Sequence, residues 1–224
     1  TLITEPTPNG PAGGMSNVTV QIRNFGTAPQ TAVPVAYSVA GGTPVTATFN
    51  GNLGPNAVAT FSMPQFLVPS GQYEFKAWTE LAGDTDNSND TSMVNRVGVP
   101  VIPLSYTGPY IDNFDGINVG WSTLTPGNPT TTWELGVPAF GATNSAFSAP
   151  NAWDVNLISG YGANANCELY SPIFDLSTSV DPKLTFWRNH TTEQAWDGVR
   201  VEYNVNGGAW TLLGGPNLAA PCWV

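Results

Sequence analysis

Basic side chains are scarce in this sequence, which has only six Lys and Arg residues among 224 and a formal net charge of −10. Proteins that bind nucleic acid use clusters of Lys and Arg to displace the counterions of the phosphates. We therefore expect no binding to nucleic acid or to an anionic membrane surface. The chain also lacks an apolar run of the ~18–20 residues that span a bilayer, so we expect no membrane insertion.

Histidine is nearly absent as well, because His190 is the only one. A serine nucleophile would have to use this histidine, and the sequence has no Gly-x-Ser-x-Gly elbow to present such a serine. It also has neither a histidine pair for zinc nor a glycine-rich phosphate loop. The sequence therefore predicts a protein that is not an enzyme.

The two cysteines, Cys167 and Cys222, allow one disulfide. A secreted protein would favour this bridge. The alternative is two buried thiols, because the sequence does not fix the geometry that a disulfide requires. Both interpretations stay open at this point.

Glycine and proline are abundant, with 24 and 20 residues, and long helical periodicity is absent. Apolar and polar residues instead alternate with a period of two, which is typical of strands with one buried face. The alternating segments are 18–23, 35–39, 73–78 and 199–205, and a further strand is expected at 184–189. Turn residues separate them, and Asn206-Gly207-Gly208 predicts a hairpin. We therefore predict an all-β fold of two tandem β-sandwiches.

A domain boundary is expected near residues 98–109, where prolines interrupt an apolar stretch. Proline blocks ladder pairing, so this stretch is interpreted as a stiff linker or as the last edge strand of the first domain. The predicted domains are residues 1–103, with about the seven strands of an Ig-like sandwich, and residues 104–224, which hold most of the tryptophans.

Residues 15–97 resemble CARDB-type Ig-like modules, which are repeats associated with bacterial cell-surface adhesion. The resemblance is carried by VTVQIRNFGT at 18–27, GQYEFKAW at 71–78 and DTDNSND at 84–90. It implies a turn of the N-x-G type after the first core strand and a polar link between the last two strands. By pattern alone the 84–90 stretch is expected to be a solvated loop with Asx turns, because it lacks the Gly and Glu of a calcium loop.

Residues 110–214 resemble the MAM-like jelly rolls of secreted Bacteroidetes proteins, which are related to gingipain-type cleaved adhesin domains. The matching blocks are NFDG at 113–116, GW at 120–121, TWELG at 132–136, NSAFS at 144–148, SPIFDL at 171–176, LTFW at 184–187 and WDGV at 196–199. Such modules usually continue further, so the jelly roll is expected to be incomplete at its C-terminus. The resemblance also implies export by the type IX route and an extracellular or cell-surface location.

The same resemblance implies a structural Ca²⁺ held by Asp115 and Asp197, with oxygens from Asn144, Ser145 or Asn151. Asp115 stands where Glu is frequent in the family, and its side chain reaches one methylene less. The alternative is that Asp115 caps a turn before Gly116 and that Asp197 begins a hairpin strand. Carboxylate and carbonyl oxygens are the ligands that Ca²⁺ prefers.

Exposed aromatic rings could stack on sugars, and the candidates are Trp153, Tyr161, Trp196 and Trp210. The competing interpretation is core packing, in which each buried ring contributes a large apolar area.

We expect a non-catalytic structural and adhesive segment of a large secreted protein, whose partners are other domains of the same chain and cell-surface proteins or glycans. Two alternatives are an accessory region of a secreted hydrolase, such as a peptidase, and a carbohydrate-binding module.

Overall fold

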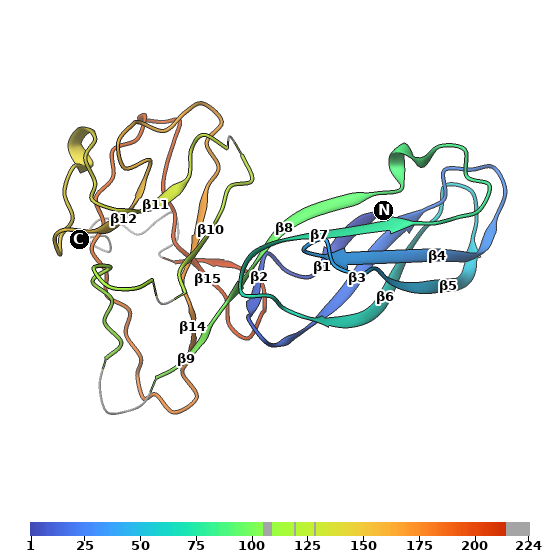
Figure 1. The fold of residues 1–224 in the computed structure, drawn as a ribbon, viewed down its shortest axis with the longest axis horizontal. Coiled ribbons are helices and arrows are strands. Elements are labelled where there is room, and N and C mark those ends of the chain that lie inside the picture. The colour runs from blue at the N-terminus through green and yellow to red at the C-terminus, as the bar shows by residue number, and fades with distance from the viewer. Residues whose placement is uncertain (105–108, 119, 128, 214–224) are drawn as a thin grey trace.

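The computed structural model describes residues 1–104, 109–118, 120–127 and 129–213, and it arranges them in two units along the long axis of the molecule (Figure 1). Two single-turn 3-10 helices, η1 (Asn87–Asn89) and η2 (Gly141–Thr143), are the only helical elements within these residues. No helix in this part of the chain is long and apolar enough to cross a membrane. The predicted all-β class is therefore confirmed.

The first unit is a sandwich of two sheets. One sheet has the strand order β1-β3-β6 and the other has the order β2-β8-β7-β4-β5. The eight strands are β1 (Leu2–Glu5), β2 (Asn9–Pro11), β3 (Met15–Arg23), β4 (Gln30–Val39), β5 (Val45–Leu53), β6 (Val58–Leu67), β7 (Gly71–Thr79) and β8 (Ser92–Val99).

The core of this sandwich is built from the apolar positions of the alternating strands. Val18, Val20 and Ile22 of β3 are at most 1 % exposed, while the residues between them are half-buried. From the facing sheet, Tyr37 of β4 stacks on Phe75 of β7, with ring centroids 5.3 Å apart. The strands predicted at 18–23, 35–39 and 73–78 are therefore confirmed, and the period-two pattern identifies their buried face.

The turn after β3 is organised by the side chain of Asn24, which is buried. Its amide nitrogen donates to the carbonyl oxygens of Ala28 and Leu53, each at 2.9 Å. Its side-chain oxygen accepts from the backbone nitrogen of Gly26, also at 2.9 Å. An asparagine suits this place because it supplies donors and an acceptor to a short turn.

The second unit consists of short strand pairs. They are β9 (Val101–Pro103) with β14 (Ile173–Asp175), β10 (Ser122–Leu124) with β13 (Glu168–Tyr170), β11 (Trp133–Gly136) with β12 (Ala152–Val155), and β15 (Glu202–Tyr203) with β16 (Thr211–Leu212). The predicted hairpin is confirmed: β15 and β16 are antiparallel, and Asn206 and Gly207 between them have positive φ. The jelly roll expected for this unit, incomplete at its C-terminus, remains a prediction.

Two of the strand predictions in this half were wrong in part or in full. The segment 184–189 is not a strand, and of the segment 199–205 only Glu202 and Tyr203 form one. The reason is that a strand needs a partner for its backbone groups, and no described strand pairs with residues 184–189. Leu184 and Trp187 are consequently about two-thirds exposed.

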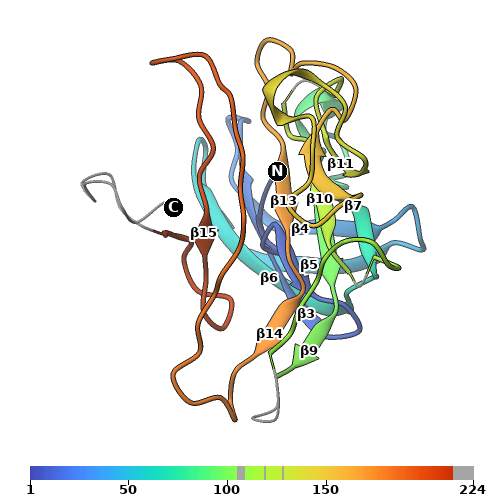
Figure 2. The same ribbon diagram turned by 90° about the vertical axis from the view of Figure 1, so that its left-hand side faces the viewer.

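The stretch at 98–103 also differs from its interpretation as a linker or an edge strand of the first domain. Val101–Pro103 form β9, which pairs in parallel with β14 of the second unit. The backbone nitrogen of Ile173 donates to the oxygen of Pro100 at 2.9 Å, and that of Leu104 donates to the oxygen of Asp175 at 3.1 Å. The pairing is compatible with the prolines because they lie at its two ends. In Figure 2, β9 and β14 lie side by side at one end of the second unit.

Candidate functional site

The two units meet in a small apolar cluster that is separate from the core of the first sandwich. Val97 and Val99 of β8 are fully buried against Leu124 of β10 and Tyr170 of β13, and Ile173 of β14 packs against them. The cluster thus joins one strand of the first unit to three strands of the second. Burial of apolar surface at about 25 cal/mol per Å² makes such a cluster stabilising.

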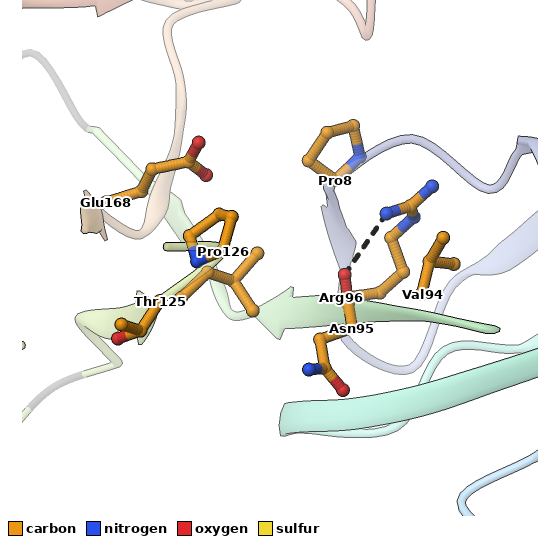
Figure 3. Close-up of a pocket in the computed structure, with 8 residues that line it drawn as sticks. Pro8, Val94, Asn95, Arg96, Thr125, Pro126 and Glu168 are labelled. Carbon is orange, nitrogen blue, oxygen red and sulfur yellow. Dashed lines mark hydrogen bonds between the residues drawn. The ribbon is translucent and has the colours of Figure 1, made fainter. Parts of the chain in front are cut away.

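A cavity of about 270 Å³ lies beside this cluster (Figure 3). Its lining comes from both units: Pro8, Val94, Asn95 and Arg96 from the first, and Leu124, Thr125, Pro126 and Glu168 from the second. These residues include one hydroxyl but neither a histidine nor a cysteine. The charged side chains of the lining are Arg96 from the first unit and Glu168 from the second.

Arg96 is the charged residue that links the wall of this cavity to the N-terminal segment. Its Nε donates to the carbonyl oxygen of Pro6 at 2.8 Å. A terminal guanidinium nitrogen donates to the backbone oxygen of Asn95 at 3.1 Å, which is the dashed line in Figure 3. Burial lowers the pKa of Arg96, and the neighbouring Tyr73, Tyr170 and Glu168 act in the opposite direction.

Glu168 lies on the opposite wall of the cavity, where its carboxylate accepts a hydrogen bond from the hydroxyl of Tyr170 at 2.6 Å. Burial and this carboxylate raise the pKa of Tyr170 well above its usual range. The tyrosine thus stays a neutral donor at physiological pH. The arrangement orients side chains at the junction of the two units, which is a structural role.

The residues implied for a calcium site are brought together only in part. Asp115 is exposed, and one of its oxygens accepts from the backbone nitrogen of Asn151 at 3.1 Å while the other accepts from Asn113 Nδ2 at 2.9 Å. Asp197 instead accepts from the hydroxyl of Tyr161 at 3.0 Å. Asn144 and Ser145 are exposed beside η2.

Within the described ranges, no group of three or more His, Cys, Asp or Glu side chains is arranged to hold a metal ion. Asp115 and Asn151 alone would give Ca²⁺ fewer oxygens than the six to eight that it takes. The calcium site stays a prediction. At 84–90 the predicted Asx turns are confirmed, because Asp86 accepts from the backbone nitrogen of Ser88 and Asp84 accepts from that of Asp86.

The four aromatic candidates have different surroundings. Trp153 is half-buried, and its indole nitrogen is hidden from solvent without a hydrogen-bond partner. Trp210 packs edge-on against Tyr170, with centroids 5.9 Å apart. Trp196 is 83 % exposed. The hydroxyl of the fourth candidate, Tyr161, hydrogen-bonds to residues of the turn that carries Trp196.

Two hydrogen bonds of the Tyr161 hydroxyl fix this turn. It donates to Asp197 at 3.0 Å and accepts from the backbone nitrogen of Glu193 at 2.8 Å. The backbone nitrogens of Trp196 and Asp197 in turn donate to the oxygen of Glu193. The exposed ring of Trp196 is thus carried on a turn that is anchored to a residue 35 positions earlier in the chain.

The second unit also has a pair of exposed aromatic residues that was not predicted from the sequence. Phe147 and Trp187 are both 69 % exposed and stack face to face, with centroids 3.9 Å apart and planes 12° from parallel. Both are aromatic residues of the sequence blocks at 144–148 and 184–187, and this was the available signal. For Arg96 the signal was its rarity, as one of six basic residues.

The remaining sequence candidates have no shared site. Cys167 is half-buried, and burial raises the pKa of its thiol. Its predicted partner Cys222 lies outside the described residues, so the disulfide stays a prediction. His190 is exposed in a segment without regular structure.

Comparison with known proteins gives limited similarity. No family model matches the chain, and no curated protein matches it. Two of the similar solved structures are of the CARDB domain of one Pyrococcus furiosus protein. The first, a crystal structure in complex with di-metal ions, has a TM-score of 0.33 and 14 % identity, and covers 41 % of this chain and 80 % of that domain. The second, a solution NMR structure, has a TM-score of 0.36 and 15 % identity, and covers 43 % and 89 %. The chain is thus similar at low identity to CARDB domains over about two-fifths of its length.

Proposed function

We propose that this chain is a non-catalytic structural and adhesive segment of a large secreted or cell-surface protein. In this proposal the first sandwich is a spacer that carries tension, and the second unit presents a surface for attachment. The observation that carries the proposal is the path of β8. This strand pairs with β2 and continues through Pro100 into β9, which pairs with β14 of the second unit.

The pairing of β2 with β8 is parallel, with Asn9, Gly10 and Pro11 opposite Val97, Gly98 and Val99. A force that pulls on the N-terminal side of β2 and on the C-terminal end of β8 draws the two strands past each other along their axes. The hydrogen bonds between them are then loaded together rather than one after another. Two of these bonds run from Val97 N to Pro8 O at 2.9 Å and from Ala12 N to Val99 O at 2.8 Å.

The tensile role is tested by single-molecule force spectroscopy of the full chain held at its two ends. Ala12→Pro removes the backbone donor to Val99 and should lower the unfolding force of the first unit, because forced unfolding depends on the barrier that these bonds supply. Ala12→Gly keeps the donor and is the matched control. Equal unfolding forces for the two variants would contradict the proposal.

The attachment surface is supported by the exposed rings of the second unit, Trp187, Phe147 and Trp196. Aromatic residues are enriched at recognition surfaces because they combine a large apolar area with few rotatable bonds. The proposal predicts that beads coated with the chain attach to a mucin-coated surface and that Trp196→Ala reduces this attachment. Ile117→Ala is the control, since Ile117 is an exposed apolar residue of the same unit.

A carbohydrate-binding module is the second candidate, and the anchored turn at Trp196 is the observation that favours it. A sugar ring could stack on the indole while Asp197 and Glu193 accept from its hydroxyl groups. Attachment to intact mucin that is lost on mucin stripped of its glycans would favour this candidate. Attachment that survives stripping would favour a protein partner instead.

A further inference from the structure

The first sandwich has four free strand edges, and three of them carry features that hinder pairing with another chain. Natural sheets protect their edges with short strands, prolines, charges or bulges. The strand β1 has four residues and an irregular register between Ile3 and Glu5. The strand β2 has three residues and ends in Pro11, and β6 contains Pro64 in an irregular stretch of its pairing with β3.

The fourth edge is β5. It differs from β6, whose residues 58–63 also pair regularly, in having no proline anywhere along the strand. Its first six residues, 45–50, pair with β4 without interruption, and the irregularity comes only after Asn50. The strand VTATFNGNL contains no charged residue and no proline. In the described sheet it pairs only with β4, so one side of its backbone is unpaired.

The pairing of β4 shows which groups of β5 face outward. The oxygen of Pro34 accepts from the backbone nitrogen of Glu80 at 2.9 Å, so the polar groups of Pro34 point toward β7. Thr48, which lies opposite Pro34 on β5, is therefore not hydrogen-bonded to it. The N–H and C=O of Thr48 point to the open edge, and by the period of two those of Thr46 and Asn50 do the same.

We propose that β5 pairs antiparallel with β5 of a second copy of this chain, about a two-fold axis at Thr48. In this register Thr48 lies opposite its own counterpart, and Thr46 lies opposite Asn50. Thr46, Thr48 and Asn50 are two residues apart and lie on the same face of the strand. In this register the buried faces of the two sheets therefore lie on the same side of the joined sheet. The same patch serves both copies, as a two-fold interface requires.

A second copy fits this edge for reasons of charge and side-chain chemistry. Each chain carries a net charge of −10, which opposes the association of two copies, and the uncharged strand β5 is a place where this repulsion is weakened. The side chains of Thr46, Thr48 and Asn50 are exposed and able to hydrogen-bond across the strands. In the single chain the backbone oxygen of Thr48 accepts a hydrogen bond from the side-chain nitrogen of Asn50 at 3.3 Å. Pairing would replace this contact with backbone hydrogen bonds.

Sedimentation equilibrium of the full chain over a wide concentration range tests this pairing. The wild type should show a monomer–dimer equilibrium. Thr48→Lys places two like charges directly opposite each other and should raise the dissociation constant by up to about fivefold. Thr48→Glu should do the same. Gln72→Lys adds the same charge at an exposed position on the central strand β7 and should leave the dimer unchanged.

Mixing the two charged variants tests the register itself. Because position 48 faces position 48 in the dimer, Thr48→Lys and Thr48→Glu should associate with each other more strongly than either does with itself. The proposal is overturned if the wild type stays monomeric at all concentrations. It is also overturned if Thr48→Lys dimerises like the wild type, which would place the contact elsewhere, or if the mixture does not restore association.

Discussion

Truncation of Leu124 to alanine should weaken the attachment of the second unit to the first. Leu124 is 3 % exposed and contacts the buried valines of β8 across the junction. Leu→Ala substitutions in cores cost about 2–5 kcal/mol, and the larger values belong to sites that cannot relax. Leu124 also lines the junction cavity, where its neighbours have room to move, so we expect about 2–3 kcal/mol. At ~1.4 kcal/mol per factor of ten, the detached population rises roughly 30- to 150-fold.

Urea denaturation followed by tryptophan fluorescence is suited to this question. Of the eight tryptophans, Trp78 alone lies in residues 1–103, so the signal reports mainly on the second unit. Leu124→Ala should lower the midpoint urea concentration of the fluorescence transition. It should lower the midpoint for the loss of backbone NMR signals from β3 and β4 by less. Leu53→Ala is the matched control, because Leu53 is equally buried but lies in the core of the first sandwich. Equal shifts of both probes in the Leu124 variant would refute the reasoning.

Three further substitutions have defined outcomes. Asn24→Ala should lower the free energy of unfolding by about 2–4 kcal/mol in a urea titration, since it removes three hydrogen bonds and leaves two carbonyls unpaired; unchanged stability would contradict the described turn. The pKa of Asp154 is raised by burial and by Glu134, which lies opposite it on β11. An aspartate with a raised pKa favours folding below pH ~3.8 and ceases to do so as the pH rises through the raised value. Asp154→Asn should therefore raise the free energy of unfolding at pH 7 by about 0.2–1 kcal/mol, toward the low end because the site is half-exposed. At pH 3 it should have no effect. Thermal melts at the two pH values measure this difference. Burial raises the pKa of Tyr73 to about 12, so the stability that its neutral phenol supplies is present below pH 10 and is lost as the pH rises toward 12; Tyr73→Phe should flatten this alkaline decline in melting temperature.

The first sandwich was predictable because its information is local. The alternation of Val18, Val20 and Ile22 with polar residues identifies both the strand and its buried face, and Asn24 with Gly26 identifies the turn that follows. These features depend on neighbours in sequence and on the pleat of a strand.

The junction and the second unit were less predictable because they depend on distant partners. The apolar pattern at 184–189 indicates a strand, but it does not say whether another strand lies beside it. The parallel pairing of β9 with β14 joins residues about 70 positions apart, and nothing in the local sequence indicates that register. Likewise, nothing in the local sequence indicates the contacts of Tyr161 with Asp197 or of Asp115 with Asn151.

We expect the β8–β9 path and the apolar cluster to join the two units into one stiff body. Backbone ¹⁵N relaxation of the full chain tests this claim most directly, because it reports the rotational correlation time of each residue. We predict one common correlation time for β3, β4 and β7 of the first unit and for β11 and β12 of the second. Two distinct correlation times, each matching a unit that tumbles on its own, would contradict it.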